Sequence, residues 1–300
     1  MPLSLIDDLR SAGFRGEILA ESPLAPLTTW RIGGPAELLA TPAGVDDVIR
    51  AVTWAHGRSL DWRILGNGSN VLVADAGVRG LVLRIRKALD HFQIDGSNVT
   101  AGAGTSGPAL AHAVALAGLS GLEFGAGIPG TIGGAIVMNA GWHEFEIGNV
   151  VDAVRYLEPG GVIVEYGRDA CRFGYRTSAF RGREGVVLAA ALALKPDDPA
   201  AVKARLARYA DSRKAGQPTE LPSCGSVFLK PEGDFAGRLI EAAGLKGRQI
   251  GGIRVSEKHA NFFVNVGGGT AKDALSLVTL VEAEVATKFG VTLTREFEVW

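Results

Sequence analysis

Several features that would assign this chain quickly to a class are scarce or missing. Only two of its 300 residues, Cys171 and Cys224, are cysteines, which excludes a disulfide framework or a zinc site built on paired cysteines. The longest apolar run, residues 186–194, is far shorter than the roughly 20 residues of a membrane-spanning helix. The N-terminus carries acids and lacks the apolar core of a secretion signal. We therefore expect a cytoplasmic protein that does not enter a membrane.

Charge and missing motifs exclude further classes. The formal net charge is −1, and the scattered basic residues do not form the patch that nucleic-acid binding requires. No G-x-x-x-x-G-K-[ST] segment occurs, which excludes a P-loop nucleotide hydrolase. The five histidines show no ligand spacing, so we expect no metal. Nothing in the sequence implies a stable protein partner.

Glycine is abundant, and it is clustered. The chain has 41 glycines, about twice the usual share of roughly 7%, without a collagen-like repeat. In "GNGSN", residues 66–70, successive backbone N–H groups after a strand can converge on an anion such as a pyrophosphate. The alternative is a simple tight turn. A second glycine-rich loop at 125–134 favours a ligand-binding role for both.

Two segments, residues 102–107 and 125–130, match the dinucleotide fingerprint G-x-G-x-x-G. That fingerprint requires a strand before it, a helix opening within it, and an acid about 20 residues later on the next strand. Glu123 follows the first match only after a Gly-Leu turn, and Pro129 interrupts the second. We therefore expect extended glycine loops rather than a Rossmann domain.

Hydrophobic patterning predicts a mixed α+β chain. Helical spacing predicts helices at 45–57, 108–117 and 271–289, the last with Thr270 and Asp273 as a capping box. Residues 195–201, "KPDDPAA", suggest a linker. The expected strands are residues 36–41, 61–65, 80–85, 98–104, 154–158, 161–166, 185–194 and 292–300.

Eight collinear blocks resemble the UDP-N-acetylenolpyruvoylglucosamine reductase family. They are "TTWRIGGPAE", "LGNGSNVLV", "GAGIPGTIGGAIVMNAG", "CRFGYRTSAF", "PSCGSVF", "AGRLIEAAGLKG", "VSEKHANFFVN" and "GVTLTREFEVW", and they span nearly the whole chain. The resemblance implies an α+β protein with an FAD-binding domain of the PCMH (vanillyl-alcohol-oxidase) type, residues 1–198, in subdomains of about 1–80 and 81–198. A smaller α+β substrate-binding domain (199–288) and a C-terminal strand (289–300) would follow.

The same resemblance implies an activity. Members are FAD enzymes that use NADPH to reduce the enolpyruvyl ether of UDP-N-acetylglucosamine to UDP-N-acetylmuramate, for bacterial peptidoglycan. The short chain resembles the compact subclass that lacks an inserted lid. Two rival hypotheses remain, namely an FAD-linked oxidase of an alcohol or lactone in the same superfamily and a non-catalytic flavin- or nucleotide-binding module.

The family motifs carry over to particular residues of this sequence. The resemblance implies Arg176, Ser226 and Glu296 as catalytic residues. We expect Tyr175, Lys230 and His259 to contact the substrate, with loop ordering as the alternative role of His259. The implied FAD contacts are Gly66, Asn67, Gly68, Ser69, Asn70, Pro129, Gly130, Thr131, Gly133 and Gly134.

Each catalytic assignment has a physical reason. Reducing a carbon-carbon double bond needs a hydride and a proton, and the Ser226 hydroxyl can donate the proton. Arg176 can hold the substrate carboxylate at two points while negative charge develops. Glu296 fits beside such charge only in its acid form. The structural alternatives are a turn residue for Ser226, a surface residue for Arg176 and a solvent-facing strand residue for Glu296.

The sequence departs from the family pattern in two places. Leu229 follows "GSVF" where a basic residue is usual, and Lys230 comes one position later. After "MNAG", the segment "WHEFEIGN" replaces the usual tyrosine-glycine turn. We expect the phosphate contact and the loop near the flavin to differ accordingly.

Overall fold

The computed structural model describes residues 2–300, which form two compact units. Both units are assembled from segments that are distant in sequence. The first comprises Met1–Glu21, Glu37–Asn67 and Arg79–Asp211, and the second Ser22–Ala36, Gly68–Val78 and Ser212–Trp300. The chain therefore passes from one unit to the other several times.

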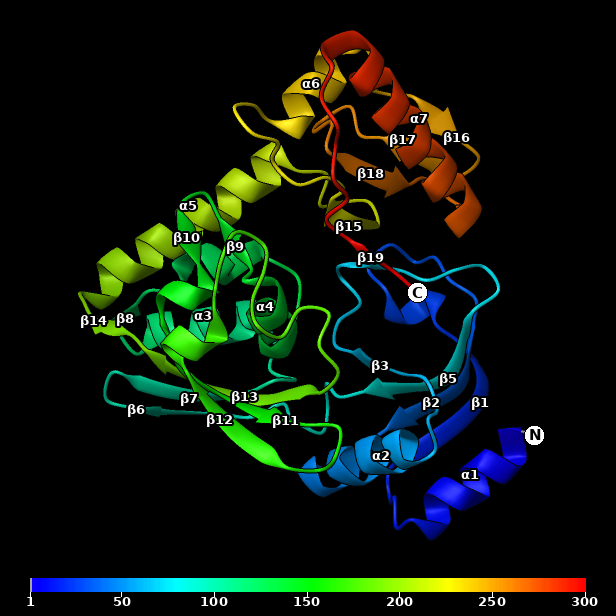
Figure 1. Ribbon diagram of the computed structural model, residues 1–300. Helices are drawn as coiled ribbons and strands as arrows, with labels where there is room; N and C mark the ends of the chain where they lie inside the picture. Colours follow the sequence, from blue (N-terminus) through cyan, green and yellow to red (C-terminus); the bar gives the residue numbers. More distant parts are fainter. Residues whose placement is uncertain (1) are drawn as a thin grey trace. The chain divides into compact units, whose positions relative to one another are not determined.

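A four-stranded sheet with the strand order β1-β2-β5-β3 opens the first unit (Figure 1). Its strands are β1 (Glu17–Pro23), β2 (Pro35–Thr41), β3 (Trp62–Leu65) and β5 (Val78–Arg84). Helix α2 (Val45–Gly57) follows β2 and buries Val48, Val52 and Ala55 against this sheet. Helix α1 (Pro2–Ser11) is tied to α2, because the Asp8 carboxylate accepts a hydrogen bond from Trp54 Nε1 at 3.1 Å.

The larger sheet of this unit is antiparallel and has the order β12-β11-β13-β7-β6. Its strands are β6 (Phe92–Asp95), β7 (Asn98–Gly102), β11 (Val151–Leu157), β12 (Ile163–Gly167) and β13 (Val186–Ala193). Helices α3 (Gly107–Leu116) and α4 (Ile132–Met138) lie over one face (Figure 1). The alanine-rich β13 leaves room for α4, so Ala190 and Ile136 are both buried in the shared core.

Short elements lie between the strands and helices of both units. They are η1 (Ala25–Leu27), β4 (Val71–Leu72), β8 (Leu119–Ser120), η2 (Glu123–Gly127), β9 (Gly141–Trp142), β10 (Phe145–Glu146), η3 (Ile147–Asn149), η4 (Arg168–Cys171) and β14 (Lys195–Pro196). Strands β9 and β10 form a small antiparallel hairpin, and β14 pairs with β8. The long helix α5 (Pro199–Gly216) follows.

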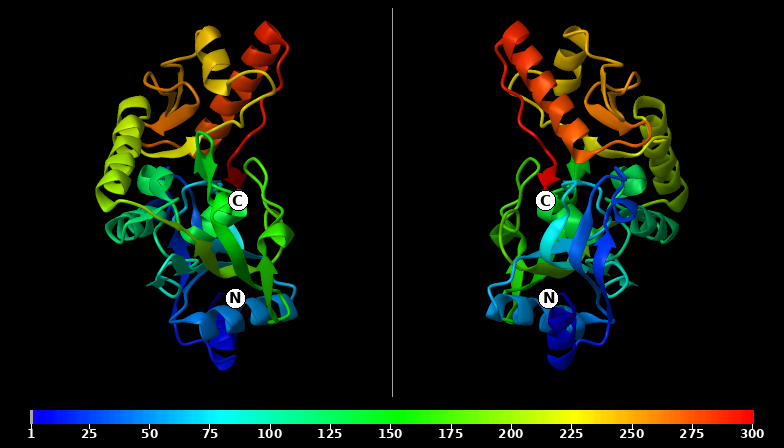
Figure 2. Two further views of the ribbon diagram at one scale, coloured as in Figure 1. Left: turned by 90° about the vertical axis from the view of Figure 1, so that its left-hand side faces the viewer. Right: turned by 90° about the vertical axis from the view of Figure 1, so that its right-hand side faces the viewer.

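The second unit is built on the antiparallel sheet β15-β18-β17-β16. Its elements are β15 (Ser223–Ser226), α6 (Ala236–Ala242), β16 (Gln249–Ile250), β17 (Ile253–Val255), β18 (Phe262–Asn265), α7 (Ala271–Phe289) and β19 (Glu298–Val299). Helices α6 and α7 cover this sheet and close its apolar core (Figures 1 and 2). Trp30, from an early segment of the chain, is fully buried in that core and packs edge-on against Phe297.

The sequence patterns located α2, α3, α7 and most of the longer strands of the first unit, but none of the strands β15 to β18. The helix at 271–289 is confirmed with its capping box, since Thr270 Oγ1 accepts from Asp273 N and Asp273 Oδ2 accepts from Thr270 N. The helix at 45–57 is confirmed as well. Two expectations are wrong: residues 195–201 are no linker, because β14 and the start of α5 occupy them, and the loop expected at 125–134 already contains the first turn of α4. The expected final strand is reduced to β19.

None of the helices in residues 2–300 combines the length and the apolar character needed to cross a bilayer. Within the same residues, no group of three or more His, Cys, Asp or Glu side chains is placed to hold a metal ion.

Candidate active site

The loop "GNGSN" packs so tightly that two of its glycines have no room for a Cβ atom. In the first unit, a Cβ on Gly66 would lie 2.6 Å from Thr131 Oγ1. In the second unit, Gly68 has φ +60°, and a Cβ there would lie 2.5 Å from the carbonyl oxygen of Leu27. Both positions therefore require glycine, because no larger residue avoids the collision.

The two G-x-G-x-x-G segments lie side by side in the first unit. Ser106, within the first segment, forms an isolated β-bridge with Thr131, which directly follows the second. The Gly107 N–H donates to the Gly130 carbonyl at 3.1 Å. Thr131 then caps α4, its hydroxyl accepting from Gly134 N at 3.4 Å. The two glycine-rich segments therefore meet next to the N-terminus of α4.

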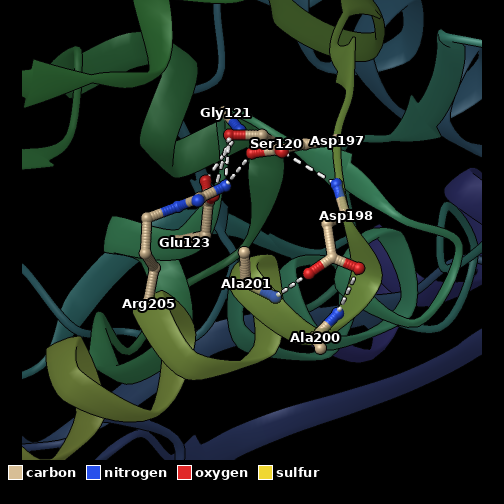
Figure 3. A network of polar contacts seen from close by, with 8 residues as sticks. All are labelled: Ser120, Gly121, Glu123, Asp197, Asp198, Ala200, Ala201 and Arg205. Atoms are coloured by element: carbon tan, nitrogen blue, oxygen red, sulfur yellow. Dashed lines mark hydrogen bonds and ion pairs between the residues drawn. The ribbon is translucent and has the colours of Figure 1, made fainter.

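A buried ion pair anchors the segment before this loop (Figure 3). The Glu123 carboxylate accepts hydrogen bonds from the Ser120 hydroxyl at 2.8 Å, from Gly121 N at 2.7 Å and from Arg205 Nε at 3.0 Å. Burial alone would raise the pKa of Glu123, but these donors more than offset it and the pKa is lowered. Glu123 is thus a structural carboxylate fixing η2 to α5.

The glycines of these loops are among the expected FAD contacts. A diphosphate is bound by closely spaced backbone N–H donors, and no side chain projects at Gly66 or Gly68, where Thr131 Oγ1 and the Leu27 carbonyl fill the Cβ positions. Gly133 is similarly constrained, because its Cβ would lie 2.8 Å from Ala103 Cβ. The side chain of Asn67 is held by Arg86, whose Nη1 donates to Oδ1 at 3.3 Å. Of the expected contacts, Pro129 and Gly134 are exposed and Thr131 is buried.

Arg176 occupies a strained turn in the first unit. Gly174 and Thr177 exchange two backbone hydrogen bonds, 3.0 and 3.1 Å long, and so close a turn with Tyr175 and Arg176 at its centre. Arg176 has φ +53°, a conformation that favours glycine. An unfavourable backbone conformation at a charged residue is typical of functional sites. The guanidinium lies over the Tyr175 ring, 5.1 Å from its centroid.

Ser226 follows a β-bulge in the second unit. Ser223 pairs with Val264 and Ser226 pairs with Phe262, so β15 carries one residue more than β18 between these pairs. Gly225 supplies the bulge with φ +83°. A bulge changes the direction of the next side chain, which is common beside active sites. The Ser226 residue itself is half-buried.

Asn261 fixes the backbone directly after Ser226. Its Oδ1 accepts from Phe228 N at 3.0 Å, and its Nδ2 donates to the Phe228 carbonyl at 2.8 Å. The Asn261 carbonyl accepts a third hydrogen bond, from Val227 N at 2.8 Å. The segment that carries Ser226 is therefore held rigidly.

Glu296 is brought next to this segment and to the glycine loop. Its backbone N–H donates to the Val227 carbonyl at 2.9 Å. Its carbonyl accepts from Asn70 Nδ2 at 3.3 Å. Burial, and after it the charge of Glu296, raises the pKa of the Cys224 thiol. The second unit thus joins Asn70, Ser226 and Glu296 in one neighbourhood.

The three expected substrate contacts differ in their surroundings. Tyr175 is exposed beside Arg176, and Lys230 lies over the exposed Phe235 ring with Nζ 4.5 Å from its centroid. His259 Nδ1 accepts from Asn261 N at 3.2 Å, which orders the loop before β18. Burial lowers the pKa of His259. Neither His259 nor Tyr175 lies in β15, the strand that carries Ser226.

Comparison with known proteins identifies the chain. Residues 217–300 match the family described as UDP-N-acetylenolpyruvoylglucosamine reductase, C-terminal domain, and residues 36–167 match an FAD binding domain. The UDP-N-acetylenolpyruvoylglucosamine reductase of Bacillus velezensis is 43% identical over 99% of this chain and 98% of its own length. The chain belongs to the UDP-N-acetylenolpyruvoylglucosamine reductase family. The reductase of Moorella thermoacetica, 42% identical, covers all of this chain and is itself covered to 99%.

Solved structures agree with this family and with the fold. The crystal structure of the family member from Thermus caldophilus has a TM-score of 0.83 at 38% identity, over 96% of this chain and 99% of that one. Berberine bridge enzyme has a TM-score of 0.51 at 14% identity, over 66% of this chain and 44% of the other, which supports the shared fold alone. The expected α+β fold with a PCMH-type FAD-binding domain is confirmed, and the protein is an FAD-containing oxidoreductase of this reductase family.

Proposed function

We propose that the protein reduces the enolpyruvyl ether of UDP-N-acetylglucosamine to UDP-N-acetylmuramate, with NADPH as the reductant, in peptidoglycan synthesis. The observation that carries the proposal is the joining of Asn70, Ser226 and Glu296 in the second unit of a chain from this family. Neither rival hypothesis, the oxidase or the non-catalytic module, requires a serine such as Ser226 and a glutamate such as Glu296 near the glycine loop. FAD, when bound by the glycine loops, supplies hydride chemistry between NADPH and the substrate.

The chain itself must supply the proton. Reducing the alkene places a hydride on one carbon and a proton on the neighbouring carbon. The Ser226 hydroxyl holds this proton on Oγ, donates it, and recovers another from water. The bulge at Gly225 and the hydrogen bonds from Asn261 to Phe228 hold the backbone on both sides of Ser226, which supports this role.

The chain must also stabilise negative charge on the substrate. Arg176 is permanently charged and can grip a carboxylate with two parallel hydrogen bonds. Loss of one such fixed donor typically costs about 3 to 4 kcal/mol of transition-state stabilisation. Glu296 in its acid form would donate a further hydrogen bond to the same carboxylate. Tyr175, Lys230 and His259 are proposed substrate contacts. The division of the chain at residues 198 and 288 is proposed from the family resemblance.

Anaerobic mixing tests the proposal. The yellow holoenzyme is mixed with NADPH and then with the enolpyruvyl sugar nucleotide, and the absorbance of the oxidised flavin is followed. We expect the colour to bleach with NADPH and to return only when the substrate is added. Return of colour with oxygen alone would favour the oxidase, and failure to bleach would favour the non-catalytic module.

The proton-donor role has its own test. Ser226→Ala should leave bleaching by NADPH unchanged and slow the substrate half-reaction roughly 10²- to 10⁴-fold, as expected for loss of a general acid. Ser276→Ala, which removes an exposed hydroxyl from α7 in the same unit, serves as the control and should change neither half-reaction much. Equal slowing of both halves by Ser226→Ala would refute the role.

A further inference from the structure

The hairpin formed by β9 and β10 contacts the side chain of Arg176. Arg176 Nη2 donates to the Gly141 carbonyl at 2.8 Å, at the first residue of the hairpin. Arg176 Nη1 lies 3.7 Å from Glu146 Oε1, at its last residue. The Arg176 and Glu146 side chains are 19% and 26% exposed. The guanidinium is thus engaged by both ends of the hairpin, most of which lies in the segment "WHEFEIGN", residues 142–149, where this sequence departs from its family.

Glu146 does not depend on Arg176 for its own position. Its Oε2 accepts from Asn139 Nδ2 at 2.6 Å, and its carboxylate also caps the following turn by accepting from the backbone of Asn149. Its backbone N–H donates to Asn149 Oδ1 at 2.8 Å. A carboxylate fixed in this way is a stationary charge that can orient a longer and more flexible partner.

Asn139 connects this carboxylate to the turn that carries Arg176. Its Nδ2 donates to the Gly174 carbonyl at 2.9 Å as well as to Glu146, and its Oδ1 accepts from Gly148 N at 2.9 Å. The side chain is 1% exposed and φ is +45°, so the residue ends α4 in a left-handed conformation that asparagine tolerates. One buried amide therefore sets the distance between Arg176 and Glu146.

Aromatic packing holds the hairpin in place. Trp142 and Phe145 both meet the Tyr209 ring of α5 edge-on, at centroid distances of 5.5 and 6.3 Å. Phe145 also stacks on Phe124 at 6.5 Å. Such pairs each contribute roughly 0.5 to 1.5 kcal/mol beyond area burial. The tryptophan and phenylalanine of "WHEFEIGN" thus fasten the hairpin to the body of the first unit.

We propose that Glu146 and Asn139 are positioning residues, which hold the Arg176 guanidinium in the orientation that the substrate carboxylate requires. The proposal rests on the proposed function, because it presupposes that Arg176 contacts the substrate. An arginine fixed before the substrate binds loses less conformational freedom on binding and needs no reorganisation as charge develops. The opposite hypothesis is that Glu146 competes with the substrate carboxylate for Arg176, and the two differ in the sign of their effect.

The test is Glu146→Gln in the holoenzyme, with Glu144→Gln as the matched control. Glu144 is exposed in the same hairpin, and the substitution removes the same charge there. Flavin content and the thermal midpoint verify folding. The NADPH half-reaction, the substrate half-reaction and calorimetric binding of the substrate to the oxidised enzyme are then measured. Arg176→Lys and the double variant Glu146→Gln/Arg176→Lys complete a double-mutant cycle.

Positioning predicts that Glu146→Gln slows the substrate half-reaction and weakens substrate binding, each about tenfold, while the NADPH half-reaction and the control stay unchanged. In the Arg176→Lys background the same substitution should have less than about a twofold effect, because the group it orients is gone. Should Glu146→Gln fold poorly, Glu146→Asp retains the charge and should give a smaller loss with the same dependence on Arg176.

Other results overturn the proposal. Tighter substrate binding by Glu146→Gln would show competition instead of positioning. Equal effects of Glu146→Gln with and without Arg176→Lys would show a purely structural role and leave the proposed function standing. If Arg176→Lys itself left the substrate half-reaction unchanged, the role of Arg176 in the proposed function would fail as well.

Discussion

Two neighbouring glycines in α4 have different requirements. A Cβ on Gly133 would lie 2.8 Å from Ala103 Cβ, whereas a Cβ on the exposed Gly134 would lie 3.7 Å from Thr131 Oγ1, an ordinary contact. We expect Gly133→Ala to lower the free energy of unfolding by about 1 to 3 kcal/mol through overpacking. Gly134→Ala should raise it by up to about 1 kcal/mol, because alanine favours a helix. Urea unfolding of both variants measures the difference, and equal effects would contradict the close approach.

The site could be predicted from sequence only where a local motif marks it. Ser226, Arg176 and Glu296 each lie in a short recognisable block, although their roles came from the family resemblance and not from spacing. Asn139 and Glu146 were missed, because each acts through Arg176 or Gly174, and those contacts join residues about 30 to 35 positions apart. The one local signal for Asn139 was an asparagine just before "AG", after an apolar stretch, because asparagine tolerates the left-handed conformation that ends α4 there.

At the scale of elements, the start of α5 depends on the protonation of one buried carboxylate. The lowered pKa of Glu123 lies below its ordinary value of 4.5. A depressed folded-state pKa adds stability that is fully present above pH 4.5 and is lost as the pH falls through the folded pKa. Glu123→Gln should therefore reduce the free energy of unfolding by about 1 to 3 kcal/mol at pH 7.

Urea unfolding between pH 7 and pH 3 checks this expectation. The difference between the wild-type protein and Glu123→Gln should shrink below pH 4.5, since the wild-type carboxyl then becomes neutral as well. Glu144→Gln, at an exposed position in the same unit, is the control and should run parallel to the wild type. A difference that stays constant across this range would contradict the assigned pKa direction.

Elements were predictable where the start and stop signals agree with the apolar pattern. Helix α7 has a capping box, regular apolar spacing and a final glycine, so its bounds follow from sequence. Helix α5 was mistaken for a linker at its start, because "DDPAA" serves equally as a loop and as a helix start. There Asp198 caps the helix by accepting from Ala201 N at 3.1 Å (Figure 3). Pro199 is the first helical residue. Only Val202 and Leu206 are buried on α5, too few to show a period.

On the scale of the whole molecule, the two units are not continuous stretches of sequence. Sequence analysis divided the chain at residues 198 and 288, and the family match begins at residue 217. The second unit also contains residues 22–36 and 68–78, which supply Trp30, Ile32 and Leu72 to its apolar core. Patterns along the chain predict local elements, but they do not reveal which distant segment completes a core.

The composition of that core predicts how the C-terminal region behaves alone. Without Trp30, a fragment of residues 217–300 lacks the ring against Phe297 and the carbonyl that accepts from Asn265 Nδ2 at 3.1 Å. A buried tryptophan replaced by alanine typically costs about 3 to 5 kcal/mol, much of a domain's net stability. We therefore expect the fragment to show poorly dispersed amide proton shifts in NMR and no cooperative unfolding transition in urea. Trp30→Ala in the full chain, the matched comparison, should fold but unfold at lower urea. A well-dispersed spectrum from the isolated fragment would show that residues 217–300 form a stable core without residues 22–36 and 68–78.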